Sequence, residues 1–60
     1  MQLLEALKSR VVIEQAEGIT AQRHGVTIDQ AYQLIRAHAR NNNASLRTVA
    51  EAIAEVGLQV

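Results

Sequence analysis

Hydrophobic residues recur along the chain with the spacing of helices, and the strict alternation typical of strands is absent. We predict helices over about residues 3–24, 28–40 and 46–56. On a wheel of about 100° per residue, the first of these helices is apolar on two opposite sides. One side carries Leu3, Leu4, Leu7 and Val11, and the other carries Val12, Ile13, Ala16 and Ile19.

Two apolar sides on one helix indicate two partners. A helix in a small bundle needs a single apolar stripe to meet its own core. We predict that the later stripe packs in this core and that the early stripe pairs with a second copy of the chain. The fold class is therefore all-α: a three-helix bundle whose long first helix extends into an N-terminal coiled coil.

Local signals place the ends of the helices. Gly25 is suited to follow the first helix, because glycine adopts left-handed backbone angles freely. Thr27 and Gln30 have the spacing of a capping box at the start of the second helix. Ser45 is the expected N-cap of the third helix, and Gly57 is expected to end it.

The second and third helices each have one apolar stripe, which we expect to face inward. The stripes are Ala31, Leu34, Ile35, His38 and Ala39 in the second helix, and Leu46, Val49, Ala50, Ile53 and Val56 in the third. Gly18 lies inside the first helix and weakens it relative to alanine. We expect Gly18 and Ala16 to form a notch where another helix packs closely.

Length and composition limit the possible functions. Sixty residues allow one domain, 1–60, and a domain this small has a thin margin of stability. The absence of cysteine excludes a disulfide framework and a thiolate metal site, which leaves oligomerisation as the usual support. No apolar run reaches the length of a membrane span, so we expect a cytoplasmic protein with no membrane partner. We also expect the chain to be the output domain of a longer regulator.

No catalytic motif is visible in the sequence. His24 and His38 are isolated from one another and from any cysteine, and there is no Ser/His/Asp set or glycine-rich phosphate loop. The domain is too small to enclose a pocket of ordinary substrate size. We predict no enzyme activity, no metal, no cofactor and no small-molecule substrate.

Basic residues near the second loop offer a binding function, although the formal net charge of the chain is zero. Arg36 and Arg40 are one turn apart on the exposed side of the second helix, three asparagines follow at 41–43, and Arg47 begins the third helix. Guanidinium groups bind phosphates, and asparagine amides read base edges. From spacing alone, a solvated helix face with a polar loop is the favoured interpretation, and a binding role is the alternative.

Four segments share a pattern that is specific in combination: 6–19 (ALKSRVVIEQAEGI), 23–32 (RHGVTIDQAY), 34–40 (LIRAHAR) and 46–50 (LRTVA). They closely resemble the ANTAR domain, the RNA-binding output module of bacterial transcription antitermination regulators. The resemblance implies a three-helix domain that dimerises through an N-terminal coiled coil and binds tandem small-loop hairpins in nascent transcripts. It also implies an upstream sensor domain, of receiver or GAF type, that controls dimerisation.

The resemblance and the expected exposure together suggest the residues that contact RNA. The first set is Arg10, Arg36 and Arg40, and proximity adds Asn42, Asn43 and Arg47. The family usually has lysine where this chain has Glu17, so an anion replaces a cation near the implied RNA-facing surface.

Two other functions remain open from the sequence. The first is a DNA-binding helix-turn-helix domain, because Gly25, Val26 and Thr27 lie between two predicted helices. The second is a dimerisation module that binds no nucleic acid, which the zero net charge and Glu17 favour.

Overall fold

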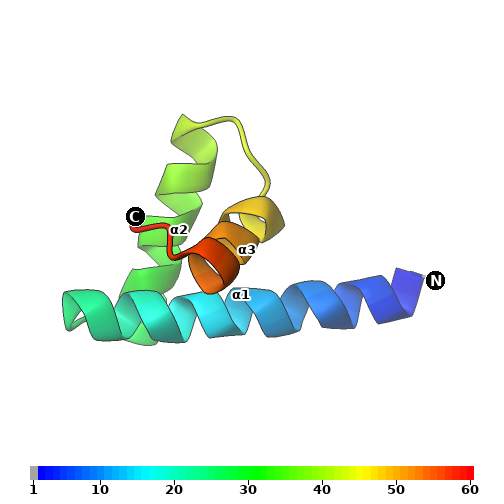
Figure 1. The fold of residues 1–60 in the computed structure, drawn as a ribbon, viewed down its shortest axis with the longest axis horizontal. Helices are drawn as coiled ribbons and strands as arrows, with labels where there is room; N and C mark the ends of the chain where they lie inside the picture. The colour runs from blue at the N-terminus through cyan, green and yellow to red at the C-terminus, as the bar shows by residue number, and fades with distance from the viewer. Residues whose placement is uncertain (1) are drawn as a thin grey trace.

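A computed structural model describes residues 2–60, and these residues form three helices. They are α1 (Gln2–His24), α2 (Ile28–Asn41) and α3 (Leu46–Val56). In Figure 1, α2 rises from the C-terminal end of α1, α3 crosses α1 near its middle, and the N-terminal part of α1 extends beyond both. The predicted three-helix fold is confirmed, and each helix boundary agrees with the prediction to within one residue.

The caps predicted from the sequence define the ends of α2 and α3. The Thr27 hydroxyl accepts a hydrogen bond from the Gln30 backbone N–H at 3.1 Å, and the Gln30 side chain accepts one from the Thr27 N–H at 3.0 Å. Ser45 caps α3 by accepting a bond from the Thr48 N–H at 3.0 Å. Gly25 and Gly57 follow α1 and α3 with φ of 65° and 78°, which glycine adopts without steric cost.

The hydrophobic core cluster lies where the three helices meet and is built from small and branched aliphatic side chains. Its buried members are Ala16, Ile35, Ala39, Val49, Ala50 and Ile53, and partly buried Val12, Ile13 and Ile19 pack against them. The later stripe of α1 therefore forms the core, as predicted. Because alanines supply half of the buried set, the helix backbones approach closely.

Two residues predicted to face inward are exposed instead. Val56 is 80% exposed and Leu34 is 37% exposed. Val56 has the correct angle on the α3 wheel, but it is the last residue of the helix. Helical periodicity fixes the direction of a side chain and not how far the neighbouring helix reaches along the axis.

The predicted close packing at Gly18 is wrong. Gly18 is exposed, and a Cβ atom built on it would meet nothing within 4 Å. Gly18 follows Val11 by seven residues, or about two turns, so it points the same way as the early apolar stripe. Ala16 points into the core from the other side of the helix.

The early stripe of α1 is exposed in the single chain. Leu3, Leu4, Leu7 and Val11 have exposed fractions of 77%, 53%, 51% and 53%. Their separation from the core agrees with the prediction of a second partner, while the coiled coil itself stays a prediction. Within residues 2–60, no helix is long and apolar enough to cross a membrane.

Candidate nucleic-acid interface

The outer side of α2 presents two arginines without internal partners. Arg36 and Arg40 are exposed, whereas Ala31, Ile35 and Ala39 bury the inner side of the helix. Within the described part of the chain, neither guanidinium makes a hydrogen bond or ion pair. The residues three and four positions away from either arginine include no carboxylate. All the donors of both groups are therefore available to a ligand.

The asparagine loop continues this surface beyond the end of α2. The Asn42 side chain donates a hydrogen bond to the His38 carbonyl at 2.8 Å, and Asn43 has a left-handed φ of 53°. The Asn43 N–H donates to the Arg40 carbonyl at 3.3 Å, which fixes the loop beside that arginine. The loop is thus a tight helix end, and it places both exposed asparagines next to Arg40. We call Arg36, Arg40, Asn42 and Asn43 the α2 basic face.

Arg47 lies elsewhere, partly exposed, and is engaged by side chains of the same chain. Its guanidinium donates to the Glu5 carboxylate at 2.8 Å and to the Ser9 hydroxyl at 3.2 Å, both on α1. It also donates to Glu51, four residues further along α3, at 3.1 Å. The hydrogen bond to Glu5, followed by that to Glu51, raises the pKa of Arg47 above its ordinary value. Arg47 therefore links α3 to α1 and is not part of the α2 basic face.

Arg10 is also paired, although it is well exposed. Its Nε donates to the Glu14 carboxylate at 3.1 Å, one turn later on α1. Figure 1 shows that the N-terminal part of α1 and the far end of α2 point in different directions. The six residues predicted to contact RNA thus divide into the α2 basic face and two paired arginines on α1 and α3.

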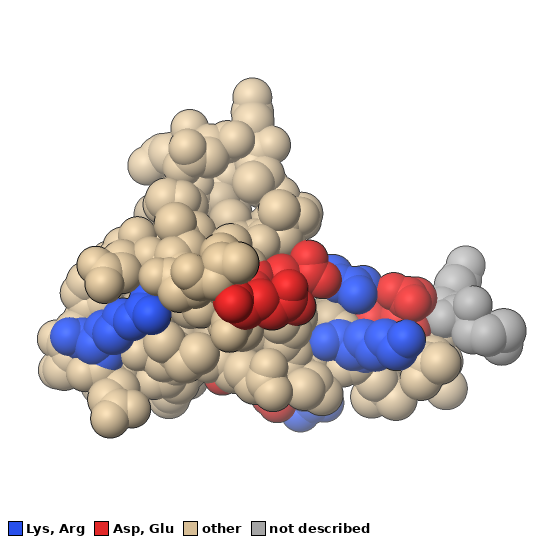
Figure 2. Space-filling view, viewed as in Figure 1, with Lys and Arg blue, Asp and Glu red and all other residues tan. Residues whose placement is uncertain are grey.

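One side of the molecule shows how charges are arranged along α1 and α3. Figure 2 shows basic and acidic side chains next to one another along α1 and α3, where the Arg47 ion pairs lie. No lysine or arginine is visible over the part of this face that α2 forms. The side of the molecule seen in Figure 2 therefore carries separate basic groups, some of them beside acidic ones, and no continuous basic patch.

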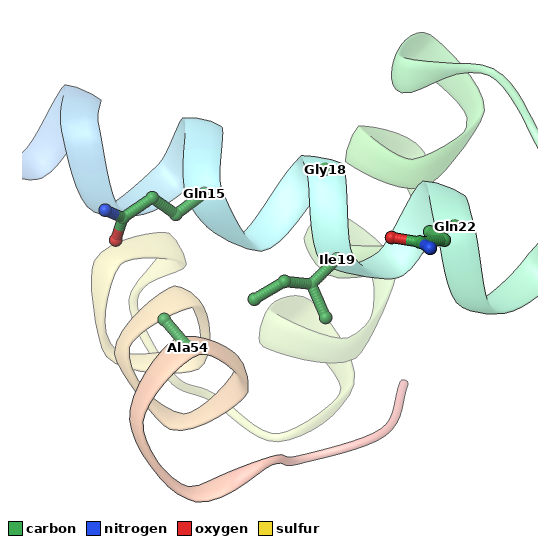
Figure 3. Close-up of a pocket in the computed structure, with 5 residues that line it drawn as sticks. All are labelled: Gln15, Gly18, Ile19, Gln22 and Ala54. Atoms are coloured by element: carbon green, nitrogen blue, oxygen red, sulfur yellow. The ribbon is translucent and has the colours of Figure 1, made fainter.

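A hollow between α1 and α3 lacks chemical groups suited to catalysis. Its volume is about 560 Å³, it is open to solvent, and its lining residues are Gln15, Gly18, Ile19, Gln22 and Ala54. Figure 3 shows Ile19 at its centre with the two glutamines on either side. None of these side chains titrates, and residues 2–60 hold no cluster of three or more His, Asp or Glu residues suited to a metal ion.

The comparison with protein-family models matches residues 1–53 of the chain to the ANTAR domain. The chain belongs to the ANTAR domain family. ANTAR domains are regulatory RNA-binding output domains and not enzymes. The comparisons with curated proteins and with solved structures gave no significant match.

Glu17 gives this ANTAR domain an acidic spot beside the start of α2. Its side chain is half-buried, and this burial raises the pKa of its carboxyl, with smaller contributions from Glu14 and Asp29. Neither Glu17 nor Asp29 makes an ion pair within residues 2–60. The carboxylate at position 17 therefore repels anions near the N-terminal end of α2, away from Arg40 at the other end.

The sequence analysis of this ANTAR domain did not identify the interhelical contacts of Arg47. One signal was present, because Glu51 follows Arg47 at the spacing of a helical ion pair. Glu5 and Ser9 are 42 and 38 residues away, so only the packing of α3 on α1 reveals those contacts.

Proposed function

We propose that this ANTAR domain binds tandem small-loop hairpins in nascent transcripts and so prevents the overlapping terminator hairpin from forming. RNA polymerase then continues through the terminator. The observation that carries the proposal is the α2 basic face, where Arg36 and Arg40 are exposed and free of carboxylate partners. Membership of a family of RNA-binding domains supports RNA as the ligand.

The chemistry of this face suits the phosphates and bases of a loop. Residues four apart on a helix have Cβ atoms about 5–6 Å from one another, so Arg36 and Arg40 present their guanidinium groups side by side. Each group binds a phosphate with two parallel hydrogen bonds. Asn42 and Asn43 add amides close to Arg40 that suit the edges of unpaired bases. Arg10 and Arg47 make weaker contacts in this proposal, because carboxylates already occupy their donors.

Two protomers bind the two hairpins. The exposed apolar residues Leu3, Leu4, Leu7 and Val11 pair with the same residues of a second copy, which removes them from water. Joining two modest RNA sites in this way raises the overall affinity for a tandem RNA through effective concentration. A sensor domain of receiver or GAF type, upstream in the full-length protein, controls the pairing, and the regulator acts on transcripts in the cytoplasm.

The proposal is tested by measuring affinity for a tandem-hairpin RNA, a single hairpin and duplex DNA over a range of salt concentrations. We expect the tandem RNA to bind at least about tenfold more tightly than the single hairpin, because avidity raises affinity by larger factors in favourable geometries. Affinity should fall with salt as counterions are displaced from phosphates. Equal affinity for single and tandem RNA, or a preference for duplex DNA, contradicts the proposal.

A variant of the dimer surface separates avidity from simple RNA binding. The double substitution Leu4→Ser and Leu7→Ser should give a monomer in sedimentation equilibrium and remove the preference for tandem RNA. Val56→Ser is the control, since Val56 is an aliphatic residue on α3 that is also exposed and lies outside the proposed interface. Loss of tandem preference in the control as well would show that these substitutions act on the fold and not on pairing.

A further inference from the structure

The single aromatic residue of the chain lies beside the α2 basic face. Tyr32 precedes Arg36 by four residues, and Arg36 precedes Arg40 by four. At about 100° per residue, these three side chains follow one another at 40° intervals around α2. Tyr32 is half-buried at the border of the core side, and both arginines are exposed. An aromatic ring and two exposed cations, unpaired within residues 2–60, therefore form one stripe along the helix.

This arrangement suits a nucleic-acid loop better than it suits phosphate alone. Proteins that bind single-stranded RNA combine cations along the backbone with aromatic rings on which unpaired bases stack. Tyr32 is only half-buried, so part of its side chain remains accessible to a ligand. No hydrogen bond is found for the Tyr32 hydroxyl within residues 2–60, so a core hydrogen bond does not explain the choice of tyrosine here.

The charges along α2 indicate which part of the RNA lies over each end. Asp29 is in the first turn, three residues before Tyr32, and no arginine pairs with it in the described chain. Its carboxylate disfavours a phosphate near the ring, whereas Arg40 favours one at the far end. A neutral base over Tyr32, with its backbone directed toward the arginines, fits this gradient of charge.

We propose that Tyr32 is a base-stacking residue, which receives an unpaired base of the RNA loop while Arg36 and Arg40 bind the adjoining phosphates. The inference rests on the proposed RNA-binding function and specifies how one nucleotide is held. Stacking on a flat ring supplies contact with any base, so Tyr32 adds affinity and fixes the register of the loop on α2.

Because Tyr32 is the only aromatic residue, its intrinsic fluorescence reports on this one position. We expect quenching when a hairpin RNA binds, and markedly weaker quenching when the loop carries an abasic site at the stacked position. Scanning the abasic site along the loop identifies that position. The RNA change leaves the protein intact, so this arm of the experiment is independent of folding.

Two substitutions complete the test. Tyr32→Phe keeps the ring and should bind hairpin RNA within about twofold of the original chain, while Tyr32→Leu removes stacking and should lose about fivefold to a hundredfold in affinity. Circular dichroism checks that both variants retain their helices. If Tyr32→Leu loses its fold, the abasic series alone decides the matter.

The outcomes distinguish this inference from the proposed function. Binding that depends on Arg36 but leaves Tyr32 fluorescence unchanged overturns the stacking role and leaves RNA binding intact. Equal quenching by intact and abasic loops at every position also overturns it, because the ring would then respond only to nearby charge. Failure of the original chain to bind any hairpin overturns the proposed function, and the stacking role with it.

Discussion

Four of the five arginines in this domain divide into two pairs whose surroundings differ. Arg10 and Arg47 each have a glutamate four residues later on the same helix and form an ion pair with it. Arg36 and Arg40 have no acidic residue at that spacing and no partner within residues 2–60. The same side chain therefore serves a structural contact in α1 and α3 and remains available for a ligand on α2.

This contrast explains how a chain with zero net charge can present a basic surface. In α2, two arginines outnumber the single carboxylate, that of Asp29. Asp29 lies in the first turn of the helix and Arg40 in the last. In α3, the single positive charge of Arg47 is outnumbered by the carboxylates of Glu51 and Glu55. Net charge averages over the whole molecule, whereas a phosphate responds to charges within roughly one Debye length, about 10 Å at moderate salt.

The largest difference between the two pairs is expected in RNA affinity. Replacing both Arg36 and Arg40 by alanine should weaken hairpin binding by about a hundredfold or more, since each hydrogen bond to a charged group contributes about 1.5–3 kcal/mol. The slope of log affinity against log salt should fall by about 1.4, because two phosphate contacts are lost. Replacing both Arg10 and Arg47 should cost less than about fivefold. Equal losses would contradict the comparison.

The fold could be predicted from the sequence because the residues that begin and end each helix act locally. Thr27 with Gln30, Ser45 with Thr48, and the glycine after α3 define helix ends within four residues of chain. The exposure of Val56 was not accessible, because the reach of a neighbouring helix is a property of the packed molecule.

The sequence predicted only part of the candidate site, because some contacts of its residues depend on how the helices pack. Arg36 and Arg40 were predicted as exposed from α2 alone, and the structure agrees. Arg47 was added to the candidates only because it lies close to the loop in the sequence. Its contact with Glu5 joins residues 42 positions apart, so the sequence did not reveal it. Spacing along a chain shows which charges share a helix face, and tertiary packing determines which of them remain free.

The paired arginines should matter more than the arginines of α2 for thermal stability, which is the reverse of the order expected for RNA affinity. Arg47→Ala removes the contacts that join α3 to Glu5 and Ser9 on α1, so the thermal midpoint should fall. Arg36→Ala removes no hydrogen bond or ion pair within residues 2–60 and should leave the midpoint unchanged. Circular dichroism melts at low and high salt would show the Arg47 effect shrinking as salt screens the ion pairs. An unchanged midpoint in the Arg47 variant would mean that these contacts add nothing to the fold.

A smaller effect is expected from releasing a paired arginine. Glu14→Gln removes the partner of Arg10 and should raise affinity for hairpin RNA by up to about threefold, in keeping with the modest strength of an exposed ion pair. Glu55→Gln is the matched control, because it changes the net charge equally at a glutamate that makes no ion pair within residues 2–60. Equal gains in both variants would assign the effect to net charge and not to the release of Arg10.

The smallest effect concerns Glu17, a carboxylate that has no arginine partner, unlike Glu14. Burial raises the pKa of Glu17 in the folded state, so its ionisation opposes folding. Its contribution to the free energy of unfolding is therefore most favourable below the pKa of an unfolded glutamate, about 4.3, and declines as pH rises through the folded value. Glu17→Gln should raise the thermal midpoint at pH 7 and lose this advantage at about pH 3.5, with Glu55→Gln as control. A gain in thermal midpoint that is constant with pH would assign the effect to side-chain packing. The ionisation of Glu17 would then carry no measurable cost to folding.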